Sequence, residues 1–160
     1  SNAGTFEIGD STGKSKTTLT LADETVFTNT GSLIVNENSY LDGRVNYADG
    51  TTVGTISGAG TIRDLYVNQK GVKMTDIFTG TTHPFVTNLY LTDSAEMSGN
   101  EIFFNYLQGN GTYSLSAGYN VSVDVKAMFL GLNGTTLNLN ESKIYQRVRN
   151  ADRRHERRDA

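Results

Sequence analysis

The chain has 160 residues, of which 36% are hydrophobic and only 19% are charged, and its formal net charge is −3. A chain of this length is typical of one domain, and the low charge density excludes the composition of simple disordered proteins. The absence of cysteine excludes disulfides and thiolate metal sites, and the abundance of Thr, Asn and Gly, which are poor helix formers, predicts an all-β fold.

A short phrase recurs along the chain: Leu-x-(Leu/Val), a polar gap of four or five residues, and another apolar residue. Its five copies are Leu19-Thr20-Leu21 with Val26, Leu33-Ile34-Val35 with Tyr40, Leu65-Tyr66-Val67 with Val72, Leu89-Tyr90-Leu91 with Met97, and Leu137-Asn138-Leu139 with Ile144. Because strand side chains alternate between two faces, we expect the first and third residues to point inward and the middle residue outward. Such a repeat predicts a solenoid of short strands whose coils stack on one another.

A second motif, apolar-x-Gly-x-Gly-Thr-apolar, occupies some of the intervals, at residues 56–62 and 107–113. Glycine accepts a positive φ without steric cost, so each glycine pair predicts a tight turn between two strands. Asparagine directly follows three copies of the first phrase and favours turns as well. Among these, Asn36 and Asn68 would form an amide ladder if their coils stacked in register.

The two ends of the chain and one internal segment depart from the repeat. Ser1 to Ala3 resemble the remnant of a removed purification tag, so we place the solenoid domain at residues 4–142. Asp76 to Phe85 hold the only proline and a glycine, and they predict a loop that leaves the stack. From Lys143 to about Arg158 the apolar residues fall at helical spacing, so residues 143–160 are predicted to be an Arg-rich helix or a disordered tail.

Three segments carry a resemblance to a known family: Gly-Ser-Leu-Ile-Val-Asn at 31–36, Thr-Ile-Ser-Gly-Ala-Gly-Thr-Ile at 55–62, and Leu-Asn-Gly-Thr-Thr-Leu-Asn-Leu at 132–139. From roughly Thr17 to Ser142 the chain resembles bacterial autotransporter passenger domains and related surface adhesins. The resemblance implies a right-handed parallel β-helix that is secreted or displayed at the bacterial cell surface. It carries over no catalytic residue. The alternative fold is a β-sandwich in which the same phrases pair antiparallel.

The sequence shows no catalytic constellation. Its two histidines, His83 and His155, lie far from any nucleophile elbow, and we interpret both as structural or solvent-exposed. The acids that a polysaccharide-active enzyme would pair on one face are Asp49, Asp64, Asp76, Asp93, Glu96, Glu101 and Asp124. Most of them adjoin turn residues, which favours solvated turns. We therefore expect a protein that is not an enzyme and holds no cofactor or metal, with a polysaccharide-active β-helix enzyme as the alternative.

The outward residues of the repeat suggest a binding face. The copies at Leu65 and Leu89 begin 24 residues apart. If they occupy successive coils, Tyr66 and Tyr90 stack on one outer face, with Ile34 beside them. Exposed apolar groups in a row dock a sugar ring, a partner protein or another solenoid. The simpler interpretations are a stabilising stack between coils or cover by the loop at 76–85.

These observations predict an adhesin-like or structural protein that attaches to a surface or to itself through an extended side face. The expected partner is a protein or glycan on a host or neighbouring cell, or a second copy of the chain. Nucleic acid is not expected, because the charges outside the Arg-rich tail are dispersed and mildly acidic. Membrane insertion of this segment is not expected either, because no apolar run approaches the roughly 18 residues of a membrane span.

Overall fold

The computed structural model describes residues 1–124 and 130–147, with the backbone alone for Asp124, Gln146 and Arg147. Its strands are β1 (Thr5–Ile8), β2 (Thr17–Thr20), β3 (Val26–Thr28), β4 (Ser32–Val35), β5 (Ser39–Tyr47), β6 (Thr55–Ser57), β7 (Thr61–Val67), β8 (Phe85–Leu91), β9 (Glu96–Gly99), β10 (Phe104–Gly109), β11 (Thr112–Leu115), β12 (Asn120–Asp124), β13 (Thr136–Asn138) and β14 (Lys143–Arg147). A single short helix, α1 (Met74–Ile77), interrupts this order within the described residues.

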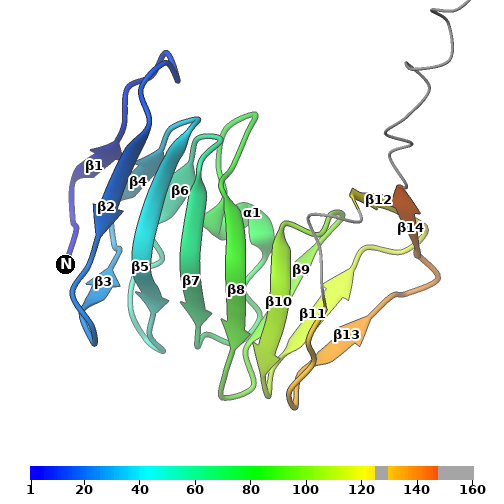
Figure 1. The fold of residues 1–160 in the computed structure, drawn as a ribbon. Helices are drawn as coiled ribbons and strands as arrows, with labels where there is room; N and C mark the ends of the chain where they lie inside the picture. The colour runs from blue at the N-terminus through cyan, green and yellow to red at the C-terminus, as the bar shows by residue number, and fades with distance from the viewer. Residues whose placement is uncertain (125–129, 148–160) are drawn as a thin grey trace, which may run out of the picture.

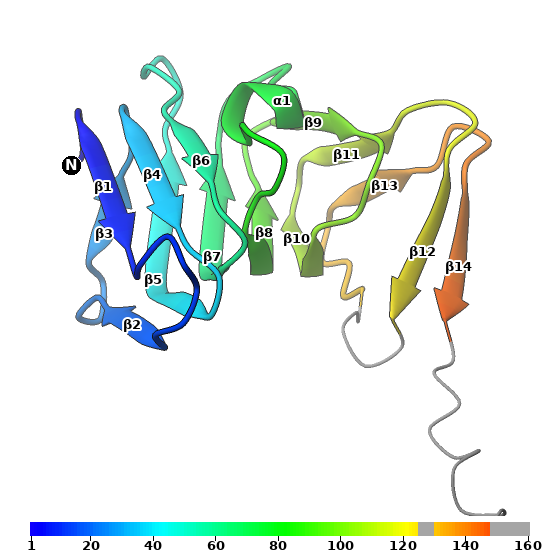
Figure 2. The same cartoon turned by 90° about the horizontal axis from the view of Figure 1, so that it is seen from above.

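The strands stack along one axis into a β-solenoid of about six turns (Figure 1). One side is a long sheet in the order β10-β8-β7-β5-β2, in which β3 also pairs with β5. The other side holds an N-terminal sheet, β1-β4-β6, followed along the axis by a C-terminal sheet, β13-β11-β9, and β12 pairs with β14 near the end (Figure 2). All these pairs are parallel. The predicted parallel β-helix is therefore confirmed, and the alternative β-sandwich is wrong because its sheets require antiparallel neighbours.

Strand β5 shows why this sequence forms coils. Its nine residues alternate strictly between buried and half-buried positions, so every second side chain faces the interior. The register with β7 and β8 then continues the buried positions Leu41, Val45 and Tyr47 into the next coils. Two such fully buried rows are Leu41–Ile62–Val86 and Val45–Leu65–Leu89. Burial of apolar surface in these rows stabilises the stack by roughly 25 cal/mol for each Å² removed from water.

The two sequence motifs lie on top of each other in adjacent coils. Leu89 of the first motif pairs with Leu107 of the second. Two residues on, Gly109 has a φ of 102°, and a Cβ added there would lie 2.2 Å from the carbonyl oxygen of Leu91 in the coil below. Glycine is therefore required both by the turn and by the close approach of two backbones. The same arrangement recurs with Leu33, Val35, Ile56 and Gly58.

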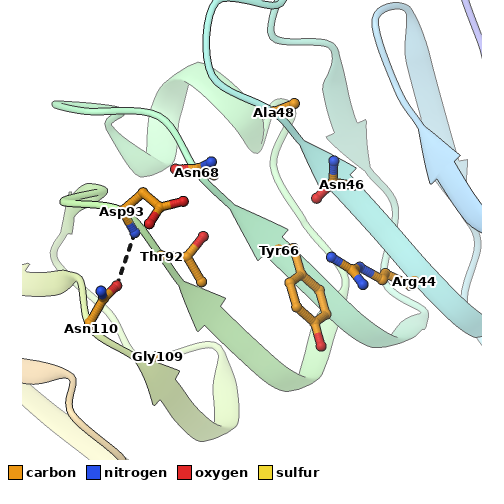
Figure 3. Close-up of a pocket in the computed structure, with 9 residues that line it drawn as sticks. All are labelled: Arg44, Asn46, Ala48, Tyr66, Asn68, Thr92, Asp93, Gly109 and Asn110. Atoms are coloured by element: carbon orange, nitrogen blue, oxygen red, sulfur yellow. Dashed lines mark hydrogen bonds between the residues drawn. The ribbon is translucent and has the colours of Figure 1, made fainter.

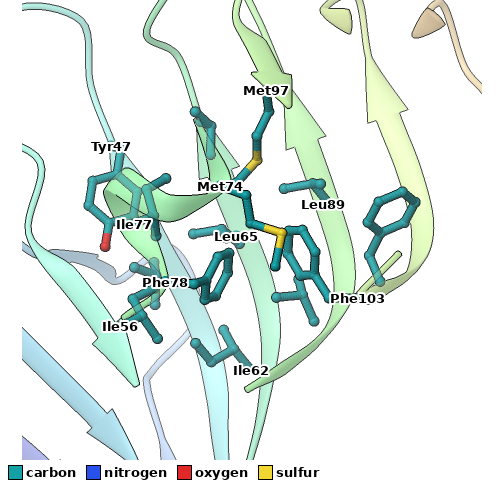
Figure 4. Packing of buried hydrophobic residues seen from close by; sticks show 14 of the residues in the cluster. Tyr47, Ile56, Ile62, Leu65, Met74, Ile77, Phe78, Leu89, Met97 and Phe103 are labelled. Carbon is teal, nitrogen blue, oxygen red and sulfur yellow. The ribbon is translucent and has the colours of Figure 1, made fainter. Parts of the chain in front are cut away.

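The segment predicted to leave the stack returns to it instead. The segment begins with the last two residues of helix α1 and continues with Phe78, and Ile77 and Phe78 are 0% and 7% exposed. Figure 4 shows both side chains packed against the core beside Leu65. Phe78 also forms a parallel bridge with Ile56. The loop prediction is wrong for Ile77 and Phe78, because their apolar side chains fill the interior where the N-terminal sheet gives way to the C-terminal sheet.

The boundary predicted at residue 143 also differs from the structure. Lys143–Arg147 forms β14, in which Ile144 pairs with Val121 of β12. The helix prediction is wrong for these five residues, because they form a strand that pairs with β12. Residues 148–160 lie outside the described part. At the other end, Asn2 of the presumed tag remnant bridges to Asn29, and its Nδ2 donates to Asn29 Oδ1 at 3.0 Å.

Candidate binding face on the long sheet

Tyr66 and Tyr90 stack on the outer face of the long sheet, as the 24-residue spacing predicts. The two residues are register partners on β7 and β8. Their ring centroids lie 4.1 Å apart and their planes differ by 14°. Partial burial, together with the charge and hydrogen bonding of the neighbouring Tyr66, raises the pKa of Tyr90 from 10.0 to about 12. Because both strands are held by the buried rows beneath them, the stack is a rigid feature of the surface.

Arg44 of β5 covers the opposite face of the Tyr66 ring. Its guanidinium carbon lies 3.6 Å from the ring centroid (Figure 3). A cation over an aromatic face contributes roughly 0.5–2 kcal/mol, depending on how far both groups are removed from water. Tyr66 is thus enclosed between Arg44 and Tyr90. A ligand therefore meets the edge of this ring and its hydroxyl group, not its face.

Ile34 does not join the tyrosine stack, so this part of the predicted binding face is wrong. It lies on β4 in the N-terminal sheet, where its register partners are Glu7 and Ser57. The residue that lies beside Tyr66 in register is Asn46 of β5. The error arose because the Leu-x-(Leu/Val) phrase occurs on both sides of the solenoid, and the phrase alone does not say which side a copy occupies.

A network of polar side chains crosses the sheet next to the stack. Arg63 donates from Nη1 to Asp42 Oδ1 at 2.6 Å and from Nε to Asp64 Oδ2 at 2.9 Å. Asn88 donates from Nδ2 to Asp64 Oδ1 at 2.8 Å, and Gln108 donates from Nε2 to Asn88 Oδ1 at 3.4 Å. The hydrogen bond to Asp64 is the main reason that the pKa of Arg63 is raised above its usual value. The network links four coils and holds their outer side chains in place.

The acids considered as a catalytic pair are spread over the surface, and three of them, Asp64, Asp76 and Glu101, take part in local hydrogen bonds. Asp64 belongs to the network above. Asp76 accepts the backbone N–H of Lys73 at 2.9 Å and so begins α1. Glu101 binds the ring of His83. Of the remaining candidates, Asp49, Asp93 and Glu96 are exposed, and the side chain of Asp124 lies outside the described part. The carboxylates that the fold does bring together are Asp42 and Asp64, and Arg63 bridges them.

His83 packs among aromatic rings. Its ring centroid lies 5.0 Å from that of Phe78 and 5.6 Å from that of Phe103, and its Nε2 lies 2.5 Å from Glu101 Oε1. This is the environment of a structural histidine. His155 lies outside the described residues. Within 1–124 and 130–147, no group of three or more His, Asp or Glu is placed to hold a metal ion.

A shallow depression of about 530 Å³ lies beside the Arg44–Tyr66 contact (Figure 3). Its polar lining comes from the long sheet and from the turns after β7, β8 and β10. The polar side chains that line it are Arg44, Asn46, Tyr66, Asn68, Thr92, Asp93 and Asn110. Asn68 and Thr92 directly follow two copies of the repeated phrase, so the turn position of the repeat was the sequence signal for this part. Asn110 stands between the two glycines of the second motif, which also predicted a turn, whereas Arg44 and Asn46 carried no comparable signal.

The amide ladder between Asn36 and Asn68 does not form. Asn36 follows β4 in the N-terminal sheet and donates from Nδ2 to Glu7 Oε1 at 2.7 Å. Asn68 follows β7 in the long sheet and lines the depression. The turn positions of the repeat therefore belong to different corners of the solenoid.

Comparison with protein-family models, curated proteins and solved structures gives no match to this chain. In the described part of the chain, no helix combines the length and the apolar character needed to cross a membrane.

Proposed function

We propose that this chain is an adhesin-like, structural β-solenoid segment that attaches to a surface through the outer face of the long sheet. The observation that carries the proposal is the Arg44–Tyr66–Tyr90 stack beside an open polar depression. Tyrosine and arginine are the residues that contribute most to recognition when a rigid framework holds them. The depression opens onto the surface of the sheet, so an extended polymer can lie across it and contact several coils.

The partner is a glycan or protein on a neighbouring or host cell, or a second copy of the chain, and we place the protein at the bacterial cell surface. The resemblance of the repeats to autotransporter passenger domains supports this setting. A polysaccharide-active enzyme needs an acid and a base that are free to exchange protons. Because Arg63 bridges Asp42 and Asp64, we do not propose that activity.

The test uses two matched double variants. Tyr66→Ser/Tyr90→Ser removes the stack, whereas Tyr119→Ser/Tyr145→Ser makes the same chemical change at residues 44% and 50% exposed near the C-terminal end. Binding to immobilised dextran, polygalacturonate and mucin is measured by biolayer interferometry, and self-association by sedimentation velocity. Circular dichroism checks that each variant folds.

We expect the wild-type chain to bind at least one of these probes or itself, and the stack variant to bind at least about tenfold more weakly. The control variant should stay within about twofold of wild type, because its residues lie off the face. The proposal is wrong if the stack variant folds and binds as the wild type does, or if the control variant loses as much.

A further inference from the structure

Arg44 differs from its neighbour Arg63 in having no anionic partner among the described residues. Arg63 is held between Asp42 and Asp64 at 2.6 and 2.9 Å. Arg44 is the register partner of Asp64, yet no ion pair joins Arg44 to any side chain in residues 1–124 and 130–147. Its Nε is buried and has no hydrogen-bond partner there. The long sheet thus presents one neutralised guanidinium and one whose charge is not balanced.

A guanidinium that is partly removed from water without a counter-ion costs free energy, and an anion bound to it offsets that cost. The guanidinium carbon of Arg44 lies 3.6 Å from the centre of the Tyr66 ring, and a planar guanidinium favours a planar, two-oxygen partner such as a carboxylate. Arg44 also lines the depression, so the space beside it is open to a ligand.

The rest of the depression indicates what accompanies that carboxylate. Asn46, Asn68, Thr92 and Asn110 line it with neutral amide and hydroxyl groups, each of which both donates and accepts hydrogen bonds. Such groups match the hydroxyls of a sugar. Asp93 lies across the depression from Arg44 (Figure 3) and offers only acceptors when ionised. The lining is therefore polarised, with a site for an anion at Arg44 and acceptors for hydroxyl donors at Asp93.

We propose that this depression binds a carboxylate-bearing sugar unit of an acidic polysaccharide, with its carboxylate on Arg44 and its hydroxyls on the amide and hydroxyl groups. This inference rests on the proposed function and names the ligand class of the same face. The volume of about 530 Å³ lies within the range of roughly 300–1,000 Å³ that is usual for small-molecule sites. Neighbouring units of the polymer then run over the exposed ring edges of the tyrosine stack.

The test compares two polymers with the same backbone, polygalacturonate and its methyl ester, because esterification removes the charge and keeps the hydroxyls. Affinities are measured for wild type, Arg44→Gln, Arg44→Lys and the control Lys14→Gln, which removes one positive charge from an exposed turn before β2. Dextran sulfate and poly-L-glutamate test whether another anion or an acidic peptide is the true ligand. Thermal melts followed by circular dichroism confirm that each variant is folded.

We expect wild type to bind polygalacturonate at least about tenfold more tightly than the methyl ester, and Arg44→Gln to lose at least about tenfold in affinity. Arg44→Lys should remain weakened, because an ammonium keeps the charge but not the planar contact. Lys14→Gln should stay within about twofold of wild type. Equal affinity for the ester, full binding by folded Arg44→Gln or Arg44→Lys, or equal Arg44-dependent binding of dextran sulfate or poly-L-glutamate overturns the inference.

The two proposals fail in different ways. If Tyr66→Ser/Tyr90→Ser weakens binding to dextran or mucin while Arg44→Gln binds every probe as wild type does, the face is adhesive and the acidic-sugar site is wrong. If neither variant changes any binding, both proposals are wrong.

Discussion

The central coils and the last coil contain the same phrase, and it is buried to very different degrees. Leu89 and Leu91 of β8 are 0% exposed, whereas Leu137 is half-buried and Leu139 is 39% exposed. β8 lies between β7 and β10, whereas among the described strands β13 pairs with β11 alone. In a solenoid each coil supplies the cover for the next. A residue pattern therefore specifies which way a side chain points, and the neighbouring coils determine whether it is removed from water.

The exposed apolar side chains follow the same division. Nearly all large hydrophobic residues exposed in the described part lie at the two ends of the stack: Phe6, Val26, Tyr119, Leu132, Leu139 and Tyr145. Tyr106 of β10 is the exception. This contrast between centre and end makes four predictions, which run from the largest expected effect to the smallest.

The largest expected difference in stability is between leucine-to-alanine substitutions in the central coils and in the last coil. Leu89→Ala leaves a cavity in a row that is covered on both sides, and we expect it to lower the free energy of unfolding by about 2–5 kcal/mol. Leu139→Ala removes a side chain already 39% exposed and should cost less than about 1 kcal/mol. Urea denaturation measures both. Similar losses at the two sites would show that the last coil is as well covered as the centre.

Two of the glycines at positive φ, Gly109 and Gly118, give a second comparison. Their φ angles are 102° and 78°, so alanine is strained at both by roughly 1–2 kcal/mol. At Gly109 the new Cβ would also lie 2.2 Å from the carbonyl oxygen of Leu91, whereas at Gly118 nothing lies within 4 Å. We expect Gly109→Ala to be the more destabilising by about 1–3 kcal/mol in thermal or urea unfolding. An equal effect would mean that φ alone sets the requirement for glycine.

A buried tyrosine hydroxyl should stabilise the central coils, whereas an exposed one at the end of the stack should contribute little. Tyr47 is 1% exposed, and its hydroxyl donates to the Gly54 carbonyl at 2.8 Å and accepts from Asn29 Nδ2 at 3.1 Å. Tyr47→Phe should lower the free energy of unfolding by about 1–2 kcal/mol, and Tyr145→Phe by less than about 0.5 kcal/mol. If both variants unfold like wild type, the Tyr47 hydrogen bonds add no net stability.

The smallest expected effect is a late ionisation of the buried tyrosines when the folded protein is titrated with alkali. Burial raises the pKa of Tyr47 and Tyr113, and burial and Tyr66 raise the pKa of Tyr90 from 10.0 to about 12. In the unfolded chain these groups lose their protons first, so stability is complete below about pH 10 and falls as the pH rises towards 12. Absorbance at 295 nm should show a group of tyrosines that ionise above the ordinary value. Ionisation of every tyrosine near pH 10 in the folded protein would contradict the burial.

The sequence by itself determined the repeated strands, the inward leucines of the central coils and the Tyr66–Tyr90 stack. These features depend on the alternation of side chains and on the 24-residue interval from Leu65 to Leu89, which is the length of one coil. Local periodicity is sufficient for such features, because each follows from the spacing of residues along one or two neighbouring strands.

Only the tertiary structure decided which side of the solenoid each copy of the phrase occupies. In the folded chain Ile34 lies in the N-terminal sheet, Ile77 is buried in the core, and Arg44 lies over Tyr66. The register between β5 and β7 shifts between Leu41 and Arg44, so counting residues along the chain does not align Arg44 with its neighbours. Coil lengths that vary from turn to turn leave the lateral alignment to packing between coils. The place of Arg44 and Asn46 in the candidate binding site, which spans several coils, was therefore visible only in the folded chain.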